Sequence, residues 1–328
     1  MTRPCPWFSI SLRERCRWAS IGMVWLFVAV TITATAVAQA PSDLVKIDGP
    51  LADQEPITPI PAPPSADPLK LALGERLFSD PRLSASGTLA CSSCHDTRTN
   101  GARPNDGTVS LRFDTPTVFN AVLNFRLNWE GDFRSLAEQA VSSLQNPVNM
   151  RSSVEDVVRK LNADPGVVNQ FRAAYGGEPN EERILDALVT FERSLVTPGA
   201  RFDRWLSGDR SALSEAELEG YRLFKSLGCG SCHQGTNVGG NLFERQGIFR
   251  PLVQRPPEIV RVPSLRNVAT TAPYFHDGSA ATLQDAVRRM AASQLDRTLT
   301  GEQVESLVAF LRTLTGNYRG SPVVGAAP

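Results

Sequence analysis

Two copies of one short motif hold the reactive side chains of this 328-residue chain. They are Cys91, Cys94 and His95 in the first copy, and Cys229, Cys232 and His233 in the second. Cysteines at positions i and i+3 lie on one face of a helical turn, where both thiols reach the vinyl groups of one haem and the histidine that follows reaches the iron. The motifs therefore predict two covalently attached c-type haems. For either copy alone, the alternative is a disulfide or redox C-x-x-C beside an incidental histidine.

The sixth ligand decides what each iron does. A second strong ligand favours electron transfer, whereas an open position lets peroxide or oxygen bind. The chain has three histidines, so after the two motifs only His276 remains, and both haems cannot be bis-histidine within one chain. Met150, Met290 and Tyr274 are the other candidates. Met290 stands in an apolar helical stripe that is more often plain core packing, and its spacing alone leaves its role open.

The first forty residues have the pattern of an export signal. Four arginines precede an apolar run that ends in Ala38-Gln39-Ala40, a small-x-small cleavage site. We predict a signal peptide over residues 1–40 and a mature chain in the periplasm. An uncleaved membrane anchor is the alternative, because the apolar run is close to the length that spans a bilayer.

Composition excludes several classes of protein. The chain has 34 Lys+Arg against 34 Asp+Glu and is 41% hydrophobic, as ordinary globular proteins are. Without long basic runs it lacks the electrostatic footprint that nucleic acid binding requires. Removal of the first forty residues, which carry four Arg and one Glu, leaves a net charge of about −3, which favours docking of a basic partner.

Apolar spacing predicts a mainly α fold. Residues 41–66 are rich in proline and are predicted to form an extended arm, after which helical spacing begins at Leu69 and recurs near 180–195 and 301–314. Strict two-residue alternation is scarce. Capping boxes predict five further helix starts: Ser135 with Glu138, Ser153 with Asp156, Ser214 with Glu217, Thr282 with Asp285, and Thr300 with Gln303.

A short internal sequence repeat indicates two related domains. Residues 74–78 read GERLF before the first motif, and residues 220–224 read GYRLF before the second. We expect two cytochrome c-like haem domains packed against each other, an N-terminal one over residues 67–200 and a C-terminal one over residues 201–328, divided near Thr197-Pro198-Gly199-Ala200.

Longer stretches resemble the bacterial di-haem cytochrome c peroxidase family, which includes the MauG-type enzymes. The resemblance runs from about residue 67 to residue 315. Its motifs are GERLFSDPRLS (74–84), TPTVFNAVLNFRLNWEG (115–131), LAEQA (136–140), VPSLRNVATTAPYFHDGS (262–279) and AVRRMAASQL (286–295), together with the two C-x-x-C-H motifs.

The resemblance implies different ligands for the two haems. The C-terminal haem resembles the family's high-potential, electron-accepting site, with His233 and Met290 as ligands. The N-terminal haem, with His95 as proximal ligand, resembles the site that reacts with peroxide. Many members close that iron with a distal histidine, but here no histidine lies between His95 and His233. The resemblance therefore implies a five-coordinate or water-bound iron that needs no reductive opening.

The resemblance also implies a set of residues around peroxide. Gln139 matches a glutamine near the peroxide site, and Trp129 matches a tryptophan between the haems that could relay electrons; the alternatives are a surface amide and a core aromatic. Asn149 stands where the family usually has a proton-transferring glutamate, and an amide cannot transfer a proton. Asp106, Glu138 or an ordered water would then serve instead, although Glu138 also fits a capping role.

One calcium ion between the domains is implied as well. Carried over from the family, its ligands are Asp114 and the main-chain carbonyls of Thr271 and Pro273, all hard oxygen donors. His276 matches a family histidine near this interface that is not usually an iron ligand, and we expect it to have a hydrogen-bonding role.

The function implied is a periplasmic di-haem peroxidase. It would reduce hydrogen peroxide to water with electrons from a small c-type cytochrome or cupredoxin, and as a family member it could form a homodimer. One alternative is a MauG-type enzyme that oxidises a partner protein at tryptophan with peroxide. The other is a non-catalytic di-haem electron carrier in which Met150 closes the first haem.

Overall fold

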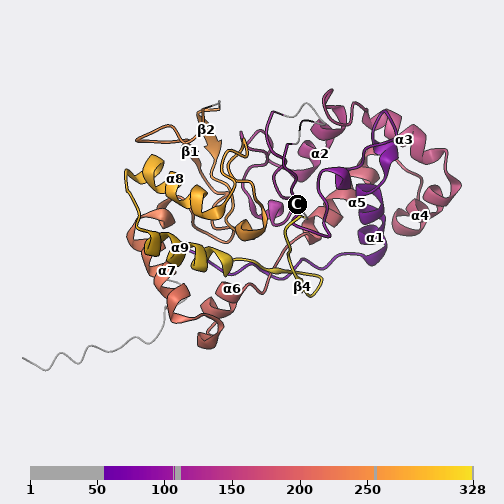
Figure 1. Ribbon diagram of the computed structural model, residues 1–328. Coiled ribbons are helices and arrows are strands. Elements are labelled where there is room, and N and C mark those ends of the chain that lie inside the picture. Colours follow the sequence, from indigo (N-terminus) through magenta and orange to yellow (C-terminus); the bar gives the residue numbers. More distant parts are fainter. Residues whose placement is uncertain (1–54, 106, 108–111, 255–256, 327–328) are drawn as a thin grey trace, which may run out of the picture. The chain divides into compact units, whose positions relative to one another are not determined.

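The computed structural model describes residues 55–105, 107, 112–254 and 257–326. Within them the chain is mainly helical, which confirms the predicted class (Figure 1). The helices are α1 (Pro68–Phe78), α2 (Leu136–Gln145), α3 (Val154–Asn162), α4 (Pro165–Tyr175), α5 (Glu181–Ser194), α6 (Arg201–Leu206), α7 (Glu215–Ser226), α8 (Leu283–Leu295) and α9 (Gly301–Arg312). Two short antiparallel ribbons pair β1 (Phe243–Arg245) with β2 (Ile259–Arg261), and β3 (Asn317–Tyr318) with β4 (Ser321–Pro322).

The predicted signal peptide and the first part of the proline-rich arm lie outside the described residues. None of the described helices combines the length and the apolar character that a bilayer crossing requires.

The same helix crossing is built twice, and we name its two copies the first module (α1–α5 and their connections) and the second module (α6–α9 and theirs). A Cβ atom added at Gly74 in α1 would lie 2.0 Å from the carbonyl oxygen of Ala187 in α5. A Cβ atom at Gly220 in α7 would lie 1.9 Å from that of Ser306 in α9. Glycine is therefore required at both crossings because the backbones touch.

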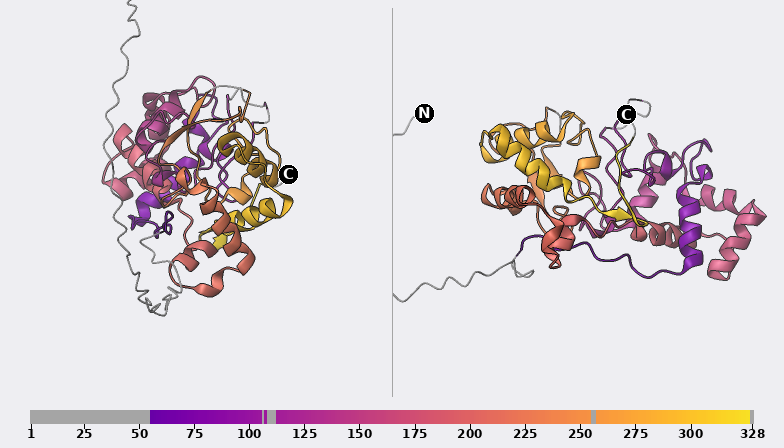
Figure 2. Two further views of the ribbon diagram at one scale, coloured as in Figure 1. Left: turned by 90° about the vertical axis from the view of Figure 1, so that its left-hand side faces the viewer. Right: turned by 60° about the horizontal axis from the view of Figure 1, so that its bottom comes forward.

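Each module has its own hydrophobic core, and the chain ends cross between them. Ile57 of the arm is fully buried in the second core, where the Pro56 carbonyl accepts a hydrogen bond from Gly235 N at 2.7 Å. In the other direction, Val323 near the C-terminus belongs to the first core, and Arg319 pairs with Glu75 of α1 at 2.6 Å. Figure 2 shows the arm running alongside the second module before it enters α1.

All five predicted caps form, but only two are reciprocal. Ser135, Ser153 and Thr282 each accept a hydrogen bond from the third residue of their helix. Ser214 with Glu217 and Thr300 with Gln303 form complete capping boxes. Glu138 instead accepts from Arg134 N at 3.1 Å, so its carboxylate still stabilises the start of α2.

Matched polar side chains form hydrogen bonds between the two modules. Asn120 and Asn267 both adopt the left-handed conformation, with φ of 61° and 60°. Their side-chain amides donate to the same hydroxyl, Thr197 Oγ1, at 2.8 and 3.0 Å. All three residues are at most 1% exposed. One buried threonine therefore joins corresponding loops of the two modules.

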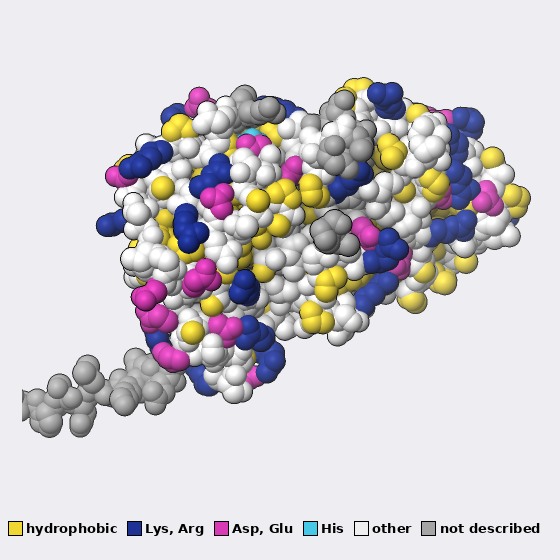
Figure 3. Space-filling view, in the orientation of Figure 1, with side chains coloured by type: hydrophobic (Ala, Val, Ile, Leu, Met, Phe, Trp, Pro, Cys, Tyr) yellow, Lys and Arg dark blue, Asp and Glu magenta, His cyan; other side chains and the backbone are white. Residues whose placement is uncertain are grey.

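The surface carries charges of both signs. On the face shown in Figure 3, basic and acidic side chains are interspersed around apolar ones. Such a pattern on this face matches the balanced composition of the sequence.

Candidate haem centres

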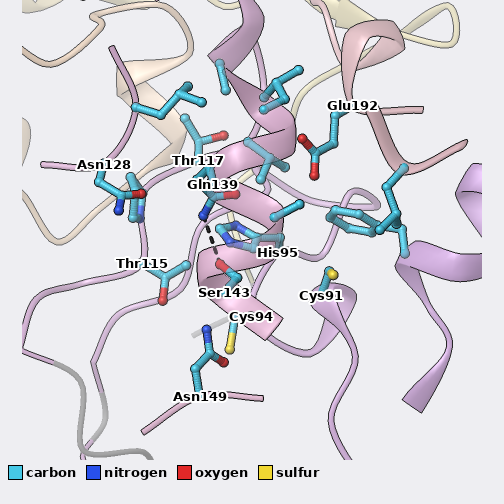
Figure 4. Close-up of a pocket in the computed structure, with 18 of the residues that line it drawn as sticks. Cys91, Cys94, His95, Thr115, Thr117, Asn128, Gln139, Ser143, Asn149 and Glu192 are labelled. Atoms are coloured by element: carbon cyan, nitrogen blue, oxygen red, sulfur yellow. Dashed lines mark hydrogen bonds between the residues drawn. The ribbon is translucent and has the colours of Figure 1, made fainter. Parts of the chain in front are cut away.

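The first C-x-x-C-H motif opens onto a cavity in the first module. Cys91 begins a 3₁₀ turn (Cys91–Ser93), which brings Cys94 and His95 to the same wall (Figure 4). The opposite parts of the lining come from α2, from α5 and from the loop that carries Thr115 and Thr117. The cavity thus meets all three side chains that haem attachment requires.

The second motif has the same local structure. Cys229 begins a 3₁₀ turn (Cys229–Ser231), and two adjoining cavities share Cys229, His233 and Met290 in their linings. Met290 comes from α8. The structure therefore brings the predicted proximal histidine and the predicted methionine ligand to one cavity.

Both histidines are held in the form that binds a metal. Nδ1 of His95 donates to the Gly101 carbonyl at 3.0 Å, and Nδ1 of His233 donates to the Val238 carbonyl at 3.3 Å. Burial lowers the pKa of both imidazoles, that of His233 to about 4. A neutral ring with Nδ1 bonded to a carbonyl leaves Nε2 for iron.

The four described cysteines are free, and Cys91 and Cys229, one from each motif, are not suited to thiol redox chemistry. Burial raises the pKa of Cys91 to about 12 and that of Cys229 to about 11. Reactive cysteines have a lowered pKa, because the thiolate is the nucleophile. The geometry thus favours thioether attachment over the disulfide or redox alternative.

Polar side chains of α2 face the first cavity. Gln139 and Ser143, one helical turn apart, both line it, and Gln139 Nε2 donates to Ser143 Oγ at 2.9 Å (Figure 4). Asn149 lines the same cavity. Glu138 does not: it borders an outer hollow together with Val141 and Gln145. Asp106 lies outside the described residues.

Comparison with known proteins identifies the family. A model described as di-haem cytochrome c peroxidase matches residues 68–211, and a cytochrome c model matches residues 218–315. The chain is 38% identical over 309 residues to a cytochrome c551 peroxidase of Nitrosomonas europaea, an alignment that covers 88% of this chain and 92% of the relative. The chain belongs to the di-haem cytochrome c peroxidase family.

Further relatives agree with this assignment. The methylamine utilization protein MauG of Methylorubrum extorquens is 34% identical over 288 residues, which cover 76% of this chain and 80% of the relative. A crystal structure of a MauG-like protein associated with microbial copper homeostasis superposes with a TM-score of 0.66 and 26% identity, covering 78% of this chain and 93% of that one. Two cytochrome c-like domains and an oxidoreductase of the cytochrome c peroxidase type are thereby confirmed, and the family supports two c-type haems.

Trp129 and His276 of this family member lie at the module junction. The Trp129 indole lines both second-module cavities, and its Nε1 donates to the Asp114 carbonyl at 2.9 Å. The His276 ring is 1% exposed and stands edge-on to Phe113, with ring centroids 4.9 Å apart. Its main-chain carbonyl accepts from Asp114 N at 2.9 Å. His276 lines a cavity that His233 also lines, but its contacts are those of a junction residue.

The predicted calcium ligands come close together around Asp114. Asp114, Thr271 and Pro273 line one cavity wall, and Asp114 Oδ2 is buried without a hydrogen-bond partner among the described residues. Burial raises the pKa of this carboxyl. A cation would satisfy the orphaned oxygen, which fits calcium. Carbonyl oxygens would have to complete the site, because the described residues contain no cluster of three or more His, Cys, Asp or Glu side chains able to hold a metal.

Two ionisable residues at the first cavity were missed by the sequence reasoning. Glu192 of α5 lines the first cavity, and burial raises its pKa to about 8. Arg261 is 5% exposed, lines the first cavity and one second-module cavity, and donates from Nε to the Asn128 carbonyl at 3.2 Å. A buried cation there suits the propionates that each haem of this family carries. The signal for Glu192 was an acid within an apolar stripe, one turn after Leu188 and next to Phe191.

Proposed function

We propose that this di-haem peroxidase reduces hydrogen peroxide to water at the His95 centre, with two electrons that enter through the His233 centre. The balanced reaction is H₂O₂ + 2e⁻ + 2H⁺ → 2H₂O. One observation carries the proposal: α2 presents the Gln139–Ser143 pair to the first cavity, whereas α8 presents Met290 to the second. A polar cavity suits a site that binds peroxide, and a thioether suits a high-potential site that transfers electrons.

The residues of each centre have separate tasks. The paired cysteines hold the two haems by thioether bonds, and Nε2 of His95 and of His233 would hold the irons, with Met290 as the second ligand of His233's iron. Bound haem supplies an iron that binds peroxide and exchanges electrons. Gln139 and Asn149 orient peroxide by hydrogen bonds.

The proton donor is proposed from the three sources that the sequence suggests. Asn149 has no titratable group, and Glu138 faces the outer hollow. Of the three sources that the sequence suggests, this leaves Asp106 and an ordered water in the first cavity.

Trp129 is proposed as the relay between the centres. It lines the second-module cavities, and its carbonyl accepts from Arg261 N at 2.9 Å, while Arg261 lines the first cavity as well. An aromatic ring at that junction shortens the distance that an electron must cross outside the haems.

The periplasmic donor is proposed to be a small c-type cytochrome or a cupredoxin. Ile248, which is 55% exposed, lines a second-module cavity, and Phe249 and Ile259 are 58% and 55% exposed. Such apolar residues suit a transient docking surface near the electron-entry centre. The net charge of about −3 for the mature chain suits a basic donor. One Ca²⁺ at Asp114, Thr271 and Pro273 and a homodimeric assembly complete the proposal.

Stopped-flow spectroscopy tests the function directly. The diferric holoprotein is mixed with one equivalent of hydrogen peroxide and then with reduced cytochrome c. We expect a rapid loss of the high-spin ferric signal, followed by fast oxidation of the cytochrome. An oxidised state that persists in the presence of the cytochrome would contradict this function.

That contradicting result would favour a second function, the oxidation of a partner protein. The substitution of Asn149 for the family glutamate and the 34% identity to a MauG protein support this alternative. It predicts a peroxide-dependent mass change on a specific protein.

The carrier alternative requires Met150 to bind the first iron. Met150 is 4% exposed and also lines the first cavity. This alternative predicts two low-spin haems and no peroxide reaction.

A further inference from the structure

We propose that Ser143 occupies, in the first centre, the place that Met290 occupies in the second, and that its hydroxyl forms with Gln139 the hydrogen-bonding group that receives peroxide. The part concerning peroxide rests on the proposed function; the part concerning position does not. With these side chains, two closely related modules would hold one iron that is open to peroxide and one that methionine closes.

The segments that lead into α2 and α8 have the same backbone structure. Leu127 N bonds to the Phe133 carbonyl at 2.9 Å, and Tyr274 N bonds to the Ala280 carbonyl at 2.8 Å. The residue after each first partner has a positive φ, 67° at Asn128 and 71° at Phe275. A glycine three residues further on also has a positive φ in both loops, 72° and 66°. A hydroxyl residue two positions beyond the second partner caps each helix.

This match fixes the register of the two helices, and their cavity-facing residues coincide. The residues of α2 that line the first cavity include Leu136, Gln139, Ala140 and Ser143. The residues of α8 that line the second are Leu283, Ala286, Val287 and Met290. Taken in order, these four residues of α2 correspond to the four of α8; Leu144, which also lines the first cavity, has no counterpart in the second lining. Ser143 therefore corresponds to Met290, and Gln139 corresponds to Ala286.

The chemistry of the two side chains differs as the two centres require. A serine side chain is shorter than a methionine side chain and has no thioether to bind iron, so the position opposite His95 stays available to a small ligand. Ser143 Oγ already accepts from Gln139, so its own O–H remains to donate. By contrast, Ser306 of α9 donates to the Glu302 carbonyl one turn earlier, a bond that Ser143 does not make among the described residues. Ser143 is thus a free donor at the cavity wall.

The decisive variant is Ser143→Met. In the ferric holoprotein we expect the high-spin signal of the first haem to be replaced by a low-spin, methionine-ligated one in electron paramagnetic resonance and optical spectra, with loss of the peroxide reaction. The reverse variant, Met290→Ser, should convert the second haem from low spin to high spin. Ser142→Met is the matched control, because Ser142 borders the outer hollow and should leave both spectra unchanged.

Further measurements keep the outcomes separate. Haem content and the thermal midpoint establish that each variant is folded and loaded. A loaded Ser143→Met protein that keeps the high-spin signal would overturn the placement, and so would a wild-type first haem that is already methionine-ligated. If the wild-type protein shows no peroxide reaction, the proposed function fails while the spectral test of position still stands. Ser143→Ala should keep the high-spin signal and slow the peroxide reaction about tenfold, the value of one hydrogen bond; an unchanged rate would overturn the hydrogen-bonding role.

Discussion

The two modules share a backbone and differ in the side chains that face their cavities. At three matched positions the first module has Gln139, Ser143 and Glu192 where the second has Ala286, Met290 and Leu311. Glu192 and Leu311 correspond because each follows the phenylalanine that packs against the crossing glycine, Phe191 or Phe310. At these positions the first centre has side chains that suit polar reactants, and the second has apolar side chains that suit electron transfer.

A second difference lies between the cavities. Asp114 N donates to the His276 carbonyl, and Arg261 N donates to the Trp129 carbonyl, both at 2.9 Å. These contacts are reciprocal, yet they are made by residues of opposite charge. The junction therefore places an acid beside the proposed calcium site and a base beside both haem cavities. The two modules keep the same fold while their chemistry differs, because the fold depends on backbone contacts. Changes to the side chains that face the cavities leave those contacts intact.

The largest expected effect comes from the shared helix crossing. Gly74→Ala and Gly220→Ala should each destabilise the holoprotein by roughly 3 kcal/mol or more, because a methyl group would overlap a carbonyl oxygen of the partner helix. Gly301→Ala is the control: a Cβ at Gly301 meets nothing within 4 Å, and alanine should stabilise α9 by about 0.5–1 kcal/mol. Denaturant unfolding measures all three. Equal mild effects at the three positions would mean that the crossings do not define the modules.

The second-largest loss of stability is expected for substitutions at Thr197, where the two modules meet. Thr197→Val removes the hydroxyl that accepts from Asn120 and Asn267 and leaves two buried amide donors unpaired, which should cost about 2–4 kcal/mol. Thr197→Ser keeps the hydroxyl and should cost about 1 kcal/mol for the lost methyl group. Calorimetry of the two variants compares them. If valine proves no worse than serine, the shared hydroxyl does not join the modules.

The sequence predicts that the two modules are related, but it does not predict how the side chains that face their cavities differ. The C-x-x-C-H motifs, the short repeat at 74–78 and 220–224 and all five caps depend on local spacing, which a sequence states directly. The match of Ser143 with Met290 does not, because 136–144 and 283–291 share few residue types. That match depends on two turns with positive φ, and here Asn128 and Phe275 adopt the same conformation with unrelated side chains. The place of Glu192 depends on which face of α5 meets a cavity, and that of Arg261 depends on how the end of β2 packs; only the packed structure determines either.

Substitutions that exchange the side-chain types of Glu192 and Leu311 should change how the stability of the protein depends on pH. Burial raises the folded-state pKa of Glu192 to about 8, above its unfolded value, so its contribution is fully present below that unfolded value and is lost as pH rises through the folded value. Glu192→Leu should therefore be more stable than wild type at pH 9, on the order of 2–4 kcal/mol, and little changed at pH 5. Leu311→Glu should become unstable at pH 9.

The surroundings of Glu192 and the control sharpen that test. The other titratable or charged groups that line its cavity are Cys91, Cys94, His95 and Arg261. Haem blocks the first three, and burial lowers the pKa of Arg261 to about 10, so this side chain is still largely charged at pH 9. Charged side chains of the helices that pack on α5 pair elsewhere, as Arg76 of α1 and Lys160 of α3 do with Asp164 and Asp156. Glu192→Gln should behave as leucine does at pH 9. A wild-type stability curve that is flat from pH 5 to pH 9 would contradict the prediction.

The smallest expected effect separates Asp114 from its counterpart Arg261. Burial and the nearby Asp277 raise the pKa of Asp114, so without a cation its charge destabilises the fold increasingly as pH rises through that raised pKa. Metal-free Asp114→Asn should therefore unfold at a higher temperature than metal-free wild type at pH 8. Calcium should reverse the order, because a ligand at 100 times its dissociation constant stabilises the binding protein by about 2.7 kcal/mol. Thermal unfolding of both proteins with and without a chelator measures whether the order of their unfolding temperatures reverses. If calcium shifts both unfolding curves equally, Asp114 binds no cation, and the acid at this junction serves packing alone.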